Sequence, residues 1–125
     1  MDQLQAILQR TFGYTTLREG QRPVMEQLLA GRDVLSVMPT GAGKSLCYQL
    51  PALAMPGITL VVSPLISLMK DQVESLIHCG VAAAYLNSSL TERQYALALR
   101  YAGEGRYKLI YMAPERLETP GFLRF

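Results

Sequence analysis

Residues 33–45 have the sequence DVLSVMPTGAGKS, in which a strand-like apolar run leads directly into a glycine-rich turn. A helix-forming run begins at Lys44, so the turn joins a strand to the start of a helix. Gly41 and Gly43 let backbone N–H groups surround phosphate oxygens without a Cβ in the way, and the helix N-terminus adds a favourable dipole. We therefore predict a nucleoside triphosphate site in which Lys44 reaches the β and γ phosphates and the Ser45 hydroxyl binds Mg²⁺.

The predicted phosphate-binding loop comprises Thr40, Gly41, Ala42, Gly43, Lys44 and Ser45. It departs from the strict pattern G-x-x-x-x-G-K-[ST] at Met38, where that pattern has glycine. Two glycines, a lysine and a serine at this spacing arise by chance on the order of 1% of the time in such a chain, so an incidental glycine-rich turn is a poor explanation. The motif predicts nucleotide binding but leaves open what the nucleotide drives, and another P-loop enzyme, such as a small-molecule kinase, stays an alternative.

From this loop onward the apolar pattern alternates between strands and helices. We predict strands at 33–37, 58–62, 81–86 and 108–112, and helices at 44–54, 65–79 and 91–102. Two features support the helices, an apolar stripe of Leu65, Leu68, Met69, Val73, Leu76 and Ile77 and a capping box of Thr91 and Gln94. This alternation predicts an α/β fold with a mostly parallel sheet, right-handed crossovers and ligand loops at the carboxyl ends of the strands.

Two more helices are predicted before the loop. Residues 2–12 have apolar side chains at the spacing of one helical face, and Gly13 ends them. A second helix is predicted over 20–31. Its inward-facing residues are predicted to be Val24, Leu28 and Leu29. The chain therefore divides into an N-terminal helical part, 1–31, and a longer α/β part, 32–125.

Composition and charge exclude several classes of protein. Half of the 125 residues are hydrophobic, enough for a folded core, and a net charge of +2 is too small to argue nucleic-acid binding by itself. Residues 45–69 contain no charge, but prolines interrupt them, so neither a membrane span nor a membrane partner is predicted.

Cys47 and Cys79 are expected to be small buried residues of apolar helices in a reducing, cytosolic-type protein. His78, the only histidine, is expected to cap a helix rather than bind a metal.

Four blocks of sequence carry a resemblance to a known family. They are FGY at 12–14 with LREGQ at 17–21, MPTGAGKSLCYQLP at 38–51, VVSPLISLMKDQ at 61–72 and YMAPERL at 111–117. In this order and spacing they resemble the RecQ family of superfamily 2 DNA helicases. The resemblance implies part of a three-layer RecA-like motor domain. It also implies an activity that couples ATP hydrolysis to translocation on single-stranded DNA and to unwinding of duplex DNA.

The first block resembles the family's adenine-recognition motif. The resemblance implies that Gln21 pairs with the base and that Tyr14 and Arg18 pack on it. A glutamine amide has the donor and acceptor that adenine N7 and N6 require. Leu17 stands where the family usually has phenylalanine, which affects packing rather than a polar contact. In this family the second block commonly begins with a residue other than glycine. Met38 is therefore consistent with a phosphate-binding loop of the family's type.

The third and fourth blocks resemble motifs that lie on single-stranded DNA in this family. The DNA-binding residues implied by the resemblance are Ser63, Pro64, Ser67, Lys70 and Arg116. A serine at a strand end and the amides of a following helix are also suitable phosphate ligands on physical grounds. Asn87 ends another strand on the same side, so it is either a phosphate or DNA contact or a simple turn residue.

Acidic catalytic residues are missing from the predicted strand ends, which are Met38, Ser63, Asn87 and Ala113. The resemblance implies a DEAH box beyond Phe125 and a second RecA-like domain with an arginine finger. We therefore expect this chain alone to be catalytically inactive. A truncated, non-catalytic nucleotide-binding or DNA-binding module stays an alternative. The expected location is the cytoplasm of a bacterium or the nucleus of a eukaryote.

Overall fold

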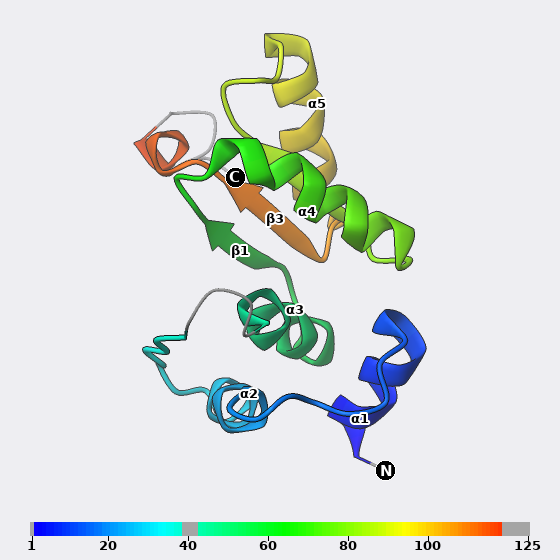
Figure 1. Ribbon diagram of the computed structural model, residues 1–125. Coiled ribbons are helices and arrows are strands. Elements are labelled where there is room, and N and C mark those ends of the chain that lie inside the picture. The colour runs from blue at the N-terminus through cyan, green and yellow to red at the C-terminus, as the bar shows by residue number, and fades with distance from the viewer. Residues whose placement is uncertain (1, 39–42, 119–125) are drawn as a thin grey trace. The chain divides into compact units, whose positions relative to one another are not determined.

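The computed structural model describes residues 2–38 and 43–118 (Figure 1). The chain folds as two compact units, Met1–Pro56 and Gly57–Phe125. The described part of the first unit is helical, and the second contains a parallel sheet with helices. The predicted division at residues 31 and 32 follows sequence motifs rather than contacts, and it stays a prediction.

Helices of the first unit begin and end close to their predicted bounds. They are α1 (Gln3–Ile7), the π-helix η1 (Leu8–Phe12), α2 (Gln21–Leu29) and α3 (Lys44–Ala54). The helix predicted over 2–12 is thus an α-helix that widens into a π-helix before Gly13. Asp2 caps α1, because its Oδ1 accepts a hydrogen bond from the Gln5 N–H at 2.8 Å. This bond, followed by one from Arg22, lowers the pKa of the Asp2 carboxyl below its ordinary value.

The core of the first unit lies between these helices. Its buried members are Leu4, Ile7, Leu8, Met25 and Leu50. From α2 the buried residues are Gln21 and Met25, which lie four positions apart on one helical face. Leu29 was predicted to face inward but is 37% exposed, because it is the last residue of α2 and lies beyond the buried turn. Val24 and Leu28 are half-buried.

The strand predicted at 33–37 is absent. Residues 32–38 have no regular secondary structure, and Leu35 and Val37 are 93% and 90% exposed. A strand requires a hydrogen-bonded neighbour, and the described residues of the first unit contain no other strand with which this run could pair. The prediction was therefore wrong, although the segment has the apolar, β-branched composition of a strand.

Three parallel strands form the sheet in the described residues of the second unit. Its elements are β1 (Thr59–Val62), α4 (Ile66–His78), β2 (Ala83–Leu86), α5 (Glu92–Gly103), β3 (Leu109–Met112) and the 3₁₀ helix η2 (Pro114–Glu118). The strand order is β1-β3-β2, and Leu109 of β3 is in register with Thr59 on one side and Ala83 on the other. The parallel sheet predicted by the alternation is confirmed. Among the described strands, β3 comes last in the sequence but lies at the centre of the sheet, and all of it is buried.

Helix α4 runs across one face of this sheet in Figure 1. Its buried residues are Met69, Val73 and Leu76, whereas the other members of the predicted apolar stripe, Leu65, Leu68 and Ile77, are exposed. In β1, Leu60 and Val62 are about half exposed. This exposure arises because α4 and α5 contact β2 and β3, and β1 is an edge of the described sheet.

Smaller predictions had mixed outcomes. The capping box at the start of α5 is confirmed, because the Gln94 N–H donates to Thr91 Oγ1 and the Thr91 N–H donates to Gln94 Oε1. Cys47 is buried as expected, but Cys79, just after α4, is exposed. His78 lies in the last turn of α4, where a cation is favoured. In the part of the chain that the structure describes, no helix is long and apolar enough to cross a membrane.

Candidate nucleotide site and strand-end surface

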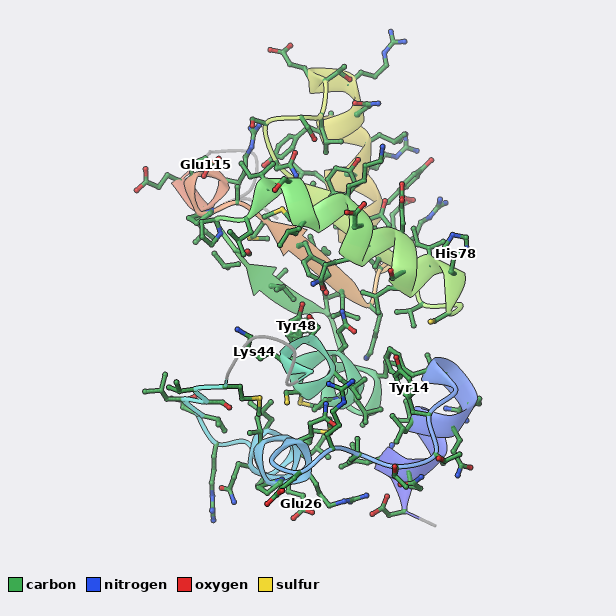
Figure 2. All side chains as sticks on the ribbon, viewed as in Figure 1. Tyr14, Glu26, Lys44, Tyr48, His78 and Glu115 are labelled. Carbon is green, nitrogen blue, oxygen red and sulfur yellow. The ribbon has the colours of Figure 1, made fainter. Side chains whose placement is uncertain are left out.

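The start of α3 is the part of the predicted phosphate site that the structure describes. Gly43 is the N-cap of this helix with φ 78° and ψ 40°, a left-handed conformation that favours glycine. Lys44 is exposed, and Ser45 is half-buried in the first turn. Figure 2 shows the Lys44 side chain extending away from the helix. Thr40, Gly41 and Ala42 lie outside the described residues.

An eleven-residue helix that begins in this way is suited to an anion. The first N–H groups of a helix have no partner within it, and its dipole is positive at this end. The ammonium group of Lys44 adds a full positive charge at the same place. The predicted binding of phosphate oxygens by Lys44 and the Ser45 hydroxyl is therefore chemically consistent with this end of α3.

Gln21 fixes the backbone of this turn. Its side chain is only 2% exposed, and its Nε2 donates a hydrogen bond to the Gly43 carbonyl oxygen at 3.1 Å. Its Oε1 accepts a hydrogen bond from the Arg18 N–H at 2.7 Å. A Cβ on Gly43 would come closer to Gln21 Nε2 than 3.0 Å, a separation that real Cβ atoms do not show. The glutamine of the first sequence block and the glycine of the second are thus in direct contact.

The structure brings together only some of the predicted adenine-binding residues. The Arg18 guanidinium lies close to Gly43, beside Gln21. Tyr14 is 58% exposed, and in Figure 2 it lies apart from Lys44, near η1. The Gln21 amide has one further N–H and one further lone pair, the pattern that adenine requires. Gln21 is buried in this structure, and its role as adenine reader stays a prediction.

Cys47 contacts residues on both sides of the phosphate loop. Its Sγ lies 3.9 Å from the Gly43 carbonyl oxygen and 4.0 Å from Met38 Sδ. Burial raises the pKa of the Cys47 thiol, so the group stays protonated and packs as a small apolar residue. The thiol therefore supports the turn rather than reacting in it.

The second candidate surface is the edge at which the three strands end. Ser63 follows β1, and its Oγ accepts a hydrogen bond from the Leu65 N–H at 3.1 Å, which shapes the turn into α4. Its own N–H donates to the Met112 carbonyl oxygen at 3.0 Å. The remaining predicted residues of this block are exposed, namely Pro64, Ser67 and Lys70. Their predicted contacts with DNA are therefore accessible from solvent.

Asn87 has the hydrogen bonds of a turn residue. It is 1% exposed, and its Oδ1 accepts a hydrogen bond from the Ser89 N–H at 2.8 Å. Its Nδ2 points to Met69 Sδ at 3.5 Å. Of the two interpretations of Asn87, this geometry favours the turn, and Ser88 and Ser89 are the exposed residues beside it. A direct contact between Asn87 and DNA stays a prediction.

Arg116 lies in η2, directly after the end of β3. Its guanidinium carbon is 4.6 Å from the centre of the Tyr95 ring in α5, within the range of a cation–π contact. The Arg116 N–H donates to the Ala113 carbonyl oxygen at 3.1 Å, which begins the 3₁₀ turn. Sequence reasoning missed Tyr95, because nothing in the chain marks a tyrosine and an arginine this far apart as partners.

Metal-binding side chains are present in the described ranges but are not clustered there. The residues that follow β1, β2 and β3 are Ser63, Asn87 and Ala113, none of which is acidic. Within residues 2–38 and 43–118, no group of three His, Cys, Asp or Glu side chains could hold a metal ion. Ser45, which lies in the first turn of α3, is the residue predicted to bind Mg²⁺ through its hydroxyl.

Comparison with known proteins identifies the class to which this chain belongs. Residues 18–123 match the family model described as DEAD/DEAH box helicase. The chain therefore belongs to the DEAD/DEAH box helicase family.

Similar relatives within that family are RecQ helicases. The chain is 49% identical over 116 residues to the ATP-dependent DNA helicase RecQ of Pasteurella multocida, covering 93% of this chain and 18% of that protein. It is 46% identical over 121 residues to the RecQ of Bacillus subtilis, covering 96% of this chain and 20% of that protein. The resemblance to RecQ is thus confirmed, and the chain spans about a fifth of the length of these relatives.

A solved structure supports the fold. The chain resembles the hypothetical ATP-dependent RNA helicase from Sulfolobus tokodaii with a TM-score of 0.72, covering 94% of this chain and 35% of that one. The sequences are 21% identical, so this likeness concerns the fold. The predicted α/β, RecA-like class is confirmed.

Proposed function

We propose that this chain is the ATP-binding part of the motor of a RecQ-like DNA helicase. In the whole protein, ATP hydrolysis would drive translocation on single-stranded DNA and unwinding of duplex DNA. The observation that carries this proposal is the contact between Gln21 and Gly43, which joins the proposed adenine motif to the start of the phosphate loop. Its 49% identity to a protein named ATP-dependent DNA helicase RecQ supports the same conclusion.

Nucleotide binding is assigned to two sets of residues. The phosphates are bound by Thr40, Gly41, Ala42, Gly43, Lys44 and Ser45. The adenine is bound by Gln21 with Arg18 and Tyr14. Ser45 contributes its hydroxyl to Mg²⁺, which neutralises phosphate charge when it is bound. Lys44 and Ser45 are the catalytic residues that this chain supplies.

DNA binding is assigned to the edge at which the strands of the second unit end. The proposed residues are Ser63, Pro64, Ser67, Lys70, Asn87 and Arg116. Lys70 and Arg116 bring positive charge to a strand of phosphates, and hydroxyl and amide groups add neutral donors. The proposed partners are therefore single-stranded and duplex DNA, in bacterial cytoplasm or a eukaryotic nucleus.

A non-catalytic nucleotide-binding or DNA-binding module is the second candidate for the isolated chain. The lack of an acidic side chain after β1, β2 or β3 favours it. The two candidates differ in turnover rather than in binding, so an ATPase assay separates them.

The test of the proposed function uses a full-length helicase that carries this sequence. ATP hydrolysis is measured with and without single-stranded DNA in the parent protein and in the Lys44→Ala and Arg116→Gln variants. We expect Lys44→Ala to reduce hydrolysis to background. We expect Arg116→Gln to leave ATP binding intact, to weaken single-strand affinity and to lower the salt slope by roughly 0.7 for one lost phosphate contact.

The matched control is Arg93→Gln, which removes the same charge from an exposed position on α5. This variant should keep the parent affinity. Hydrolysis that survives Lys44→Ala would contradict the nucleotide assignment. A DNA affinity and salt slope that are the same in Arg116→Gln and Arg93→Gln would contradict the DNA assignment.

A further inference from the structure

We propose that Tyr95 is a positioning residue that holds the guanidinium of Arg116 ready for a phosphate of single-stranded DNA. This inference rests on the proposed function, in which Arg116 contacts DNA. It adds a residue from outside the four sequence blocks that resemble RecQ. The observation behind it is the placement of the Arg116 guanidinium over the Tyr95 ring at 4.6 Å.

Contacts within α5 and with the core hold the Tyr95 ring in place. The Tyr95 N–H donates to the Thr91 carbonyl oxygen at 2.9 Å, in a helical turn that the Thr91–Gln94 capping box anchors. The side chain packs against a buried cluster that consists of Leu86, Ala102, Ile110 and Met112. The ring therefore offers a rigid face, because a turn of α5 and the ends of β2 and β3 all determine its place.

Arg116 is joined to the same strand ends through its backbone. Its N–H donates to the Ala113 carbonyl oxygen, and the Ala113 N–H in turn donates to the Leu86 carbonyl oxygen at 3.1 Å. Leu86 is also a member of the cluster under Tyr95. Arg116 is thus connected to the carboxyl end of β2 in two ways. Its backbone is connected through Ala113, and its guanidinium is connected through the Tyr95 ring.

Stacking on a ring and binding a phosphate use different parts of a guanidinium. The ring interacts with the face of the cation, whereas the N–H donors lie in its plane and point outward. An arginine that is already stacked loses less side-chain freedom when it meets a phosphate than a mobile one does. Tyr95 therefore raises DNA affinity without contacting DNA.

The alternative is that Tyr95 only fills the core beside α5. A phenylalanine would then serve as well as tyrosine, and so would a leucine that packs well. The positioning role makes a different demand, because it requires an aromatic ring and requires Arg116 to be present. Two comparisons follow from this difference.

The experiment measures the affinity of the full-length helicase for a fluorescent single-stranded oligonucleotide by anisotropy, at several salt concentrations. The variants are Tyr95→Leu, Tyr95→Phe, Arg116→Gln and the double variant Tyr95→Leu with Arg116→Gln. We expect Tyr95→Leu to weaken binding roughly 2- to 5-fold, the effect of one exposed cation–π contact, and Tyr95→Phe to stay close to the parent. In the Arg116→Gln background, Tyr95→Leu should have no further effect.

Several outcomes would overturn the inference. Tyr95→Leu could leave affinity unchanged, Tyr95→Phe could bind as weakly as Tyr95→Leu, or the losses of the two single variants could add in the double variant. If Arg116→Gln weakens binding and Tyr95→Leu does not, only the positioning role fails. If Arg116→Gln has no effect, the proposed DNA contact fails and the positioning role fails with it.

Thermal unfolding of each variant checks that the comparison is made between folded proteins. Should Tyr95→Leu fail to fold, a series of ring-fluorinated phenylalanines at position 95 replaces it. These keep the shape of the ring and weaken the negative potential of its face. Affinity that falls with each added fluorine supports the positioning role, and affinity that does not change overturns it.

Discussion

Replacing Gly43 by alanine should destabilise the first unit through two separate effects. The first is the φ of 78°, in which an L side chain costs about 1–2 kcal/mol. The second is the overlap of the new Cβ with Gln21 Nε2, which must move and lose its 3.1 Å hydrogen bond to the Gly43 carbonyl oxygen. Since Gln21 is buried, a displaced partner costs about 1–3 kcal/mol more.

Gly20→Ala is the control that separates these effects. Gly20 has a φ of 87°, and a Cβ there would meet nothing within 4 Å. The backbone cost and the reduced entropy of the unfolded chain are therefore similar in both variants. The difference between their free energies of unfolding reports the contact with Gln21, and we expect it to be about 1–3 kcal/mol.

Urea unfolding of the 125-residue chain, followed by far-ultraviolet circular dichroism, measures this difference. A third comparison introduces Gly43→Ala into a Gln21→Ala background. There the amide that causes the overlap is gone, so the cost of Gly43→Ala should fall to that of Gly20→Ala. Equal destabilisation by Gly43→Ala and Gly20→Ala in the parent sequence would refute the proposed contact.

Three further predictions follow from the same structure. In a full-length helicase, Gln21→Ala should weaken ATP use by about 1–3 kcal/mol and leave GTP use nearly unchanged; equal effects on the two nucleotides in a steady-state assay would contradict base reading. The 125-residue chain should bind Mg²⁺-nucleotide weakly, with Lys44→Ala abolishing that binding, and its ATPase should sit at background, since an arginine finger alone contributes roughly 10³–10⁵ in rate. Lys44-dependent turnover stimulated by DNA would show that the catalytic acids had been misplaced. Thr91→Ala should lower the free energy of unfolding by about 1 kcal/mol, because it removes the acceptor of the capping box, and Thr91→Ser should restore most of the loss.

Local signals predicted much of the fold. Helix α3 begins at Lys44 and ends at Ala54 as the sequence indicated, because Gly43 and the Pro56-Gly57 pair bound it. The capping box of α5 was likewise predictable from the sequence, because its two residues are only three positions apart. The prediction of a strand at 33–37 failed because a strand depends on a neighbouring strand, often one far away in the sequence, and apolar composition does not supply one.

The candidate site was also predictable only where its features are local in the sequence. Lys44 and Ser45 could be placed at a helix start because the motif itself contains the turn and the helix. The hydrogen bond from Gln21 to Gly43 spans 22 positions, and the pairing of Arg116 with Tyr95 joins two different elements. Such pairs are set by packing between elements. The resemblance to RecQ predicts roles for Gln21 and Arg116, but it does not predict which residues they contact.

The central place of β3 has a consequence for synthesis on the ribosome. In the described sheet β1 and β2 are not neighbours, and each pairs only with β3. Translation adds roughly 5–20 residues per second, so the roughly 50 residues between Val62 and Met112 take about 2.5–10 seconds. During that interval β1 exists without its hydrogen-bonding partner. A nascent chain paused before Leu109 is therefore a suitable client for chaperones that bind extended apolar segments, and one released after Met112 can close the sheet.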